Sequence, residues 1–125
     1  MAEANHRLTR DERLRSFGAL RRLFKEGRSE FIYPFRYMVL SEEAAESSVS
    51  VLFSTPKRFH KRANKRNLLR RRMREAYRLN KELLAQLDRP RHADIAIIYS
   101  SKEVHNYKTI EHAIRRILEA IRKSL

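Results

Sequence analysis

Apolar residues recur at intervals of three and four in several stretches of the chain, which is the spacing of amphipathic helices. The first stretch contains Leu14, Phe17, Leu20, Leu23 and Phe24. Thr9 and Glu12 have the spacing of a capping box, and Gly27 stands where a left-handed residue would end a helix. We therefore expect a first helix between Thr9 and Gly27, preceded by a disordered segment 1–8.

Two more helices are predicted in the second half of the chain. One should extend from about Asn67 to Leu87, because Pro90 would end it. The other should follow Asn106. Its apolar stripe consists of Ile110, Ala113, Ile114, Ile117, Leu118 and Ile121.

Strand patterns occur in three places. Residues 31–40 alternate with period two, although Pro34 favours an edge position or a bulge. The residues expected on one face of this strand are Phe31, Tyr33, Phe35, Tyr37 and Val39. An acidic loop, 41–48, leads to a second strand at 49–54, and residues 94–100 have the apolar centre of a strand that is covered on both faces.

The predicted order is helix, strand, strand, basic loop, helix, strand, helix. This order indicates an α+β fold, a mixed two-layer domain in which helices pack on a central sheet. A length of 125 residues fits one domain, 1–125.

Composition narrows the class of protein. Lys and Arg number 29 against 15 Asp and Glu, a net charge of +14, while the hydrophobic content of 42% suffices for a core. The absence of cysteine excludes disulfides and thiolate metal sites. The longest apolar run, Ile95 to Tyr99, is too short to span a bilayer. We expect a cytoplasmic protein with a polyanionic partner and no membrane.

The positive charge is concentrated in one segment. Residues 57–78 contain eleven Lys or Arg and a single acid, Glu75, so they carry +10 of the +14. Placed on a helix, the arginines and the apolar residues separate onto two faces, with Arg72 on a third side. Cations at i and i+4, as in Arg66, Arg70 and Arg74, disfavour a helix, and the pattern does not alternate in sign as a solvated face would. Guanidinium groups bind phosphate in a bidentate manner, so this face is predicted to bind nucleic acid.

Several other activities lack the residues they require. A helix-turn-helix reader needs a helix directly before the recognition helix, whereas the preceding segment is strand-like, so no DNA partner is expected. The only glycines are Gly18 and Gly27, and the five histidines show no metal-ligand spacing. The acids Glu42, Glu43 and Glu46 are interpreted as a solvated loop. No catalytic or metal-binding residue is predicted in the protein.

Residues 61–78 resemble the signature of the bacterial ribonuclease P protein subunit. The matching positions are Arg62, Ala63, Arg66, Asn67, Arg70, Arg71, Arg74, Glu75, Tyr77 and Arg78. The resemblance extends to Leu23–Gly27, to 49–54 and to 94–98, and so covers roughly residues 8–122. It implies a left-handed βαβ crossover, which general chain handedness would not predict.

The resemblance also implies a function. Proteins of this family assist a ribozyme that removes the 5′ leader from precursor tRNA, and the catalytic groups and Mg²⁺ belong to the RNA. The residues expected to bind the catalytic RNA are Lys57, Arg58, Lys61, Arg62, Lys65, Arg66, Asn67, Arg70, Arg71, Arg74 and Arg78. A second surface, between the first helix and the sheet, should stack the single-stranded leader on Phe24, Tyr33 and Tyr37.

Two alternatives stay open at this point. One is a ribosomal or ribosome-assembly protein of similar fold, which would bind RNA without a substrate. The other is a nuclease that acts alone, which would cleave RNA with no catalytic RNA present.

Overall fold

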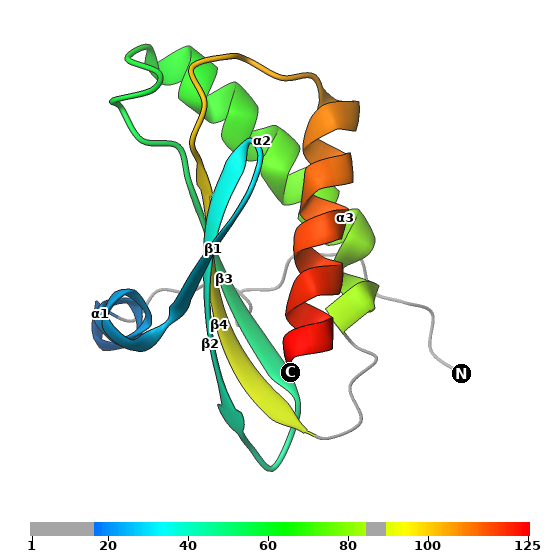
Figure 1. Ribbon diagram of the computed structural model, residues 1–125. Helices are drawn as coiled ribbons and strands as arrows, with labels where there is room; N and C mark the ends of the chain where they lie inside the picture. Colours follow the sequence, from blue (N-terminus) through cyan, green and yellow to red (C-terminus); the bar gives the residue numbers. More distant parts are fainter. Residues whose placement is uncertain (1–16, 85–89) are drawn as a thin grey trace.

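The computed structural model describes residues 17–84 and 90–125. In Figure 1, a four-stranded sheet carries α1 (Phe17–Glu26) on one face and α2 (Ala63–Asn80) and α3 (Tyr107–Ser124) on the other. The strands are β1 (Arg28–Ile32), β2 (Phe35–Glu43), β3 (Ser48–Ser54) and β4 (Arg91–Tyr99), in the sheet order β1-β2-β4-β3. A short 3-10 helix, Lys81–Leu84, continues α2. The predicted α+β class with a central sheet is confirmed, and α1 adds a small layer on the second face.

The segment 31–40 forms a hairpin, so the prediction of a single strand was wrong. β1 and β2 pair antiparallel from Arg28↔Val39 to Ile32↔Phe35, and the cis peptide bond Tyr33–Pro34 lies in the turn between them. Proline has no N–H to donate to a ladder and therefore marks the turn. The reversal pairs Phe31 with Arg36, which moves Phe31 to the opposite face from Phe35.

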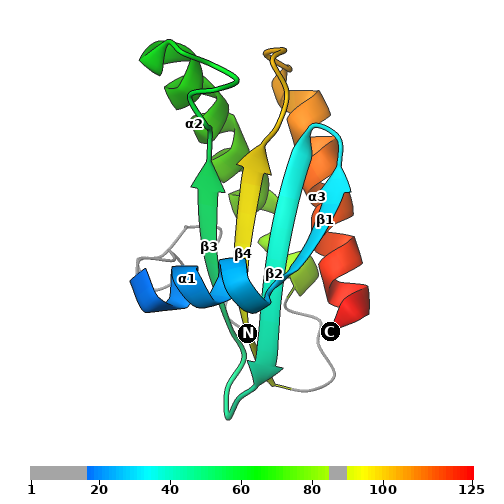
Figure 2. The same cartoon turned by 60° about the vertical axis from the view of Figure 1, so that its left-hand side comes forward.

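β3 and β4 pair in parallel and are connected through α2. In Figure 2 both strands point upward, α2 lies behind the sheet, and β4 stands to the right of β3. This arrangement is a left-handed crossover, as the family resemblance implied. Crossovers of this kind are right-handed in about 98% of cases, so general rules alone would have predicted the wrong hand.

The core fills the space between the sheet and the pair α2 and α3. All six residues of the predicted α3 stripe are buried, and on β4 they meet Ile95, Ile97 and Tyr99. The Asn106 side chain caps α3 by accepting a hydrogen bond from the Thr109 N–H at 2.9 Å. On the other face a smaller cluster joins Leu23 of α1 to Met38 and Ala96. β4 is therefore covered on both faces, as its apolar centre predicted.

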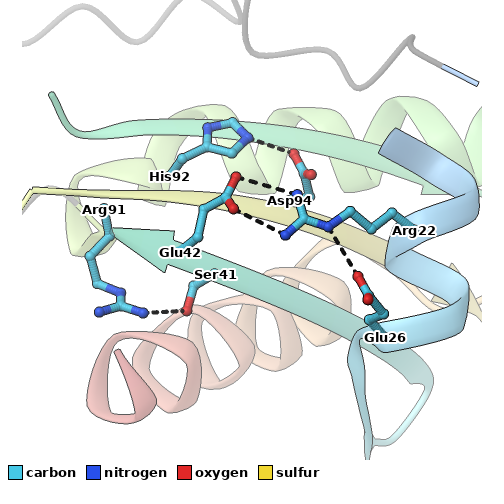
Figure 3. Close-up of polar contacts among 7 residues, drawn as sticks. All are labelled: Arg22, Glu26, Ser41, Glu42, Arg91, His92 and Asp94. Carbon is cyan, nitrogen blue, oxygen red and sulfur yellow. Dashed lines mark hydrogen bonds and ion pairs between the residues drawn. The ribbon is translucent and has the colours of Figure 1, made fainter. Parts of the chain in front are cut away.

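A polar contact also attaches α1 to the sheet, as Figure 3 shows. The Arg22 guanidinium donates to the carboxylates of Glu26 and Glu42, each at 3.0 Å. Glu42 was expected in an acidic loop, but β2 continues to Glu43 because its residues 41–43 pair with residues 91–93 of β4. The hydrogen bond from Arg22 lowers the pKa of Glu42 below its ordinary value.

Other predicted element boundaries also change. The capping box at Thr9 and Glu12, the segment 1–8 and Leu87 lie outside the described residues. Gly27 has no positive φ, which corrects the expected left-handed position. Here the chain passes directly from α1 into β1, and a Cβ on Gly27 would lie 2.4 Å from the Leu23 carbonyl oxygen. No helix within residues 17–84 and 90–125 is long and apolar enough to cross a membrane.

Candidate nucleic-acid interface

The predicted cations gather on α2 and on the loop that precedes it, residues 55–62, which we call the basic loop. Figure 1 shows this loop beyond the end of β3, joined to the first turn of α2. Helix α2 begins at Ala63, four residues before the predicted start at Asn67. The earlier start was missed because residues 63–66 carry no apolar periodicity.

Burial separates α2 into two faces, as predicted. Leu69, Met73, Ala76 and Tyr77 are buried, and the Tyr77 ring packs edge-to-face on Phe53 with centroids 5.6 Å apart. The exposed residues of the loop and helix form what we call the cationic surface. Its members are Lys57, Arg58, Lys61, Arg62, Lys65, Arg71 and Arg74. Asn67 is exposed among them, whereas Arg66, Arg70 and Arg78 are half-buried.

Two of the predicted RNA-binding arginines hold the basic loop in place. Arg66 Nη1 donates to the carbonyl oxygens of His60 at 3.0 Å and Lys61 at 2.7 Å. Arg70 Nη2 donates to Thr55 Oγ1 at 3.0 Å. Each guanidinium has five N–H donors, so these contacts leave others for a phosphate. The arginines of α2 therefore fix the shape of the loop that carries Lys57 and Lys61.

Arg78 and Arg72 have protein partners as well. Arg78 donates to both carboxylate oxygens of Glu75, at 3.1 and 2.6 Å, and this contact lowers the pKa of Glu75. Arg72 Nη1 donates to the His105 carbonyl oxygen at 2.5 Å. Arg72, which the sequence pattern predicted on a third side of the helix, thus joins α2 to the loop after β4.

A buried histidine attaches the basic loop to the end of β4. His60 is only 7% exposed, and its Nε2 lies 2.8 Å from the Ser101 carbonyl oxygen. Because a carbonyl only accepts, Nε2 of His60 carries the proton. The ring packs edge-to-face on Tyr99 at 5.6 Å. Sequence analysis missed this role, since His60 stands among cations with no apolar periodicity around it.

Tyr33, in the β1–β2 turn, contacts the loop that follows β4. Its hydroxyl lies 3.1 Å from Ser101 Oγ and 3.1 Å from His105 Nε2. Its ring packs edge-to-face on His105, with centroids 5.3 Å apart, and is 53% exposed. The His105 ring lies 6.2 Å from that of Tyr99. Burial raises the pKa of Tyr99 to about 12, and the Tyr99 hydroxyl donates to the Glu103 carbonyl oxygen at 2.7 Å.

The three predicted leader-stacking aromatics have different surroundings. Tyr37 is 3% exposed inside the core, where burial raises its pKa. This corrects its assignment, because a ring enclosed by the protein offers no face to a base. Phe24 on α1 is 49% exposed and Tyr33 is 53% exposed, so both remain candidates.

The structure adds Phe31 to this set of exposed aromatics. It is 54% exposed, and its ring lies 6.4 Å from that of Tyr33. Its cross-strand partner Arg36 is two residues before Met38, which packs under α1. Phe31 and Arg36 therefore lie on the α1 face of the sheet, beside the part that α1 covers. Recognising Pro34 as a turn would have placed Phe31 correctly.

The described residues contain no group of three or more His, Asp or Glu that could hold a metal ion. What the surface offers is phosphate contact through the cationic surface and base stacking on exposed rings.

Comparison with known proteins identifies a single family. The family model for ribonuclease P matches residues 8–122. The ribonuclease P protein component of Porphyromonas gingivalis strain ATCC 33277 is 39% identical over 115 residues, which cover 89% of this chain and 83% of the relative. That of Chlorobium phaeobacteroides is 33% identical over 130 residues, covering 94% and 89% of the two chains.

Solved structures agree with the sequence relatives. The ribonuclease P protein from Thermotoga maritima superposes with a TM-score of 0.68 at 25% identity, covering 87% of this chain and 96% of that one. The Staphylococcus aureus ribonuclease P protein has the same fold, with a TM-score of 0.68 at 16% identity and coverage of 89% and 95%.

Proposed function

The chain belongs to the ribonuclease P protein family, and from this membership we propose that it binds the catalytic RNA and the 5′ leader of precursor tRNA. It is the protein component of an endonuclease ribonucleoprotein that processes tRNA 5′ ends. In the proposed reaction the RNA supplies the catalytic groups and holds Mg²⁺, and cleavage leaves a 3′-hydroxyl and a 5′-phosphate. Neither the matched family nor the named relatives support the alternative of a ribosomal protein.

The observation that carries the proposal is the cationic surface. Seven exposed Lys and Arg side chains lie on one loop and the helix that follows it. Each phosphate that they neutralise releases condensed counterions, which favours binding and makes it depend on salt. Closely spaced phosphates of a folded RNA repel one another, so the same contacts would stabilise the folded, Mg²⁺-binding form of the RNA.

The leader would bind on the α1 face of the sheet. Phe24 and Phe31 offer exposed rings there, and Tyr33 offers one at the adjoining β1–β2 turn. Stacking of a base on such a ring is worth about 1–3 kcal/mol. Arg36 lies opposite Phe31 and can contact a phosphate between stacked bases. Stacking requires no particular base, which suits leaders of differing sequence. The proposed partners are thus the catalytic RNA and precursor tRNA in the cytoplasm, with no DNA and no membrane.

The test is reconstitution with a bacterial ribonuclease P RNA at low Mg²⁺. Adding the chain should restore cleavage of precursor tRNA, because protein cations replace part of the Mg²⁺ that the RNA needs to fold. The same chain without RNA should give no cleavage, and cleavage there would indicate a nuclease that acts alone. Absence of stimulation by the chain would contradict the proposal.

A further inference from the structure

The two proposed RNA-binding surfaces meet at one buried residue, Ser101. From the side of the basic loop, His60 donates to its main-chain carbonyl at 2.8 Å. From the side of the β1–β2 turn, the Tyr33 hydroxyl bonds to its Oγ at 3.1 Å. Ser101 is 7% exposed and lies two residues after Tyr99, the last residue of β4. One residue thus binds both the basic loop and an exposed aromatic ring.

The surroundings of this contact restrict movement of either partner. His60 is held on its loop side by Arg66, which donates to the His60 carbonyl oxygen at 3.0 Å. Tyr33 is held by a second hydrogen bond, from its hydroxyl to His105 Nε2 at 3.1 Å. The His105 carbonyl in turn accepts from Arg72 of α2. Hydrogen bonds therefore connect α2 to Tyr33 through His105.

We propose that the hydrogen-bonded chain His60–Ser101–Tyr33 positions the exposed ring of Tyr33 relative to the basic loop, so that leader binding depends on a residue of the RNA-docking loop. The inference rests on the proposed function, since it takes Tyr33 as a leader contact and the basic loop as a dock for the catalytic RNA. His60 and Ser101 are positioning residues: both are buried, and neither can stack on a base. RNA that displaces the loop would shift Ser101, and with it the ring of Tyr33.

The experiment compares binding of two precursor tRNAs to the reconstituted holoenzyme, one with a five-nucleotide leader and one with a single-nucleotide leader. The leader ratio is the Kd for the single-nucleotide leader divided by the Kd for the five-nucleotide leader. It isolates the contribution of the leader from effects on folding and on docking of the catalytic RNA. Tyr33→Phe keeps the ring but removes the hydroxyl with its contacts to Ser101 and His105. It should lower the ratio at least threefold, because the loss of each hydrogen bond is expected to cost about threefold to tenfold. Affinity of this variant for the catalytic RNA should not change.

His60→Phe keeps a ring against Tyr99 but loses the bond to Ser101. It should lower the leader ratio by a similar factor, although His60 itself cannot reach the leader. His60→Gln, whose amide can donate to the same carbonyl, should restore most of the ratio. The double variant Tyr33→Phe/His60→Phe should lose little more than either single variant, because residues that act through one contact are not additive.

Tyr37→Phe is the matched control, since it removes a tyrosine hydroxyl from the same sheet outside this chain of contacts. It should leave the leader ratio unchanged. The inference is overturned if Tyr33→Phe or His60→Phe leaves the ratio at its native value, or if the two losses multiply in the double variant. If the native chain fails to stimulate cleavage or shows no leader dependence, the proposed function fails first. If the native chain stimulates cleavage and shows leader dependence, but the variants have the native leader ratio, only this inference is overturned and the proposed function stands.

Discussion

Neighbouring arginines of α2 have different roles. Arg66 and Arg70 bond to the basic loop, and Arg72 bonds to the loop after β4, whereas Arg71 is exposed on the cationic surface. A helix advances 100° per residue, so adjacent positions face different partners. The motif of residues 61–78 therefore combines exposed cations with residues that shape the surface. Substituting Arg66 would alter the loop as well as the charge, and effects on RNA binding there cannot be assigned to phosphate contact alone.

Gly27 is required by a close approach and not by backbone handedness. A Cβ at this position would lie 2.4 Å from the Leu23 carbonyl oxygen and 2.9 Å from Leu23 Cδ1. The backbone between α1 and β1 must shift to accept it. We expect Gly27→Ala to lower the free energy of unfolding by about 1–3 kcal/mol, measured by urea denaturation. Gly18→Ala, at an exposed position of α1, should cause no loss, and equal losses in both variants would contradict the explanation.

At the scale of elements, α1 is attached to the sheet by a small apolar cluster and by Arg22. The Arg22 guanidinium bridges Glu26 within the helix and Glu42 on β2. Because Phe24 lies on this helix, the attachment also sets where the leader would stack. The other two helices pack into the main core.

The attachment of α1 should weaken in acid. Arg22 lowers the pKa of Glu42 from its ordinary value of 4.5, so the charged form is stabilised in the folded state. That contribution is complete above pH 4.5 and is lost as the pH falls through the lowered pKa. The protection factors of α1 amides, which compare observed exchange with the intrinsic rate at each pH, should therefore fall in acid more than those of α3 amides. The pair is exposed, so the effect is local and modest.

The variant Glu42→Gln should give α1 its faster exchange already at neutral pH. Glu46→Gln, in the turn after β2, makes the same chemical change away from Arg22 and should leave α1 exchange as in the native chain. If Glu42→Gln left α1 exchange at neutral pH unaltered, the attachment would rest on the apolar cluster alone.

Elements with strong apolar periodicity were predicted well, and those defined by turns or by polar contacts were not. The α3 stripe and the centre of β4 are buried as expected, because burial alone determines their patterns. The β1–β2 hairpin was missed because alternation continues through Tyr33 and Pro34. The role of His60 was missed because it depends on the Ser101 carbonyl, which is distant in sequence and carries no side-chain signal.

The same distinction applies to the candidate site. The cationic surface follows from charge density, which a sequence displays directly. The exposure of Phe31 and the burial of Tyr37 follow from the register of the hairpin, which the sequence pattern did not reveal. Alternation identifies two faces of a strand but does not say which one the core covers.

At the scale of the whole molecule, topology brings the two surfaces to one end of the sheet. β3 and β4 are parallel, so both end there, and β2 begins there because it runs antiparallel to β4. The ladder places Phe35 opposite Tyr99 and Ser54 opposite Ile98. The basic loop, the loop after β4 and the β1–β2 turn therefore leave the sheet at the same end, as Figure 2 shows. The parallel pairing of β3 and β4 is what makes their contact at Ser101 possible.

The net charge of +14 permits two descriptions of RNA binding, a general attraction or a local dock. The pairs Arg71→Ala/Arg74→Ala on α2 and Arg115→Ala/Arg116→Ala on α3 distinguish them, because each removes two exposed positive charges and leaves +12. A local dock predicts that only the α2 pair reduces the slope of log affinity against log salt, by up to about two phosphate contacts. The measurement is a titration of each variant against the catalytic RNA at several salt concentrations. Equal reductions for the two pairs would show that net charge, and not the cationic surface, governs binding.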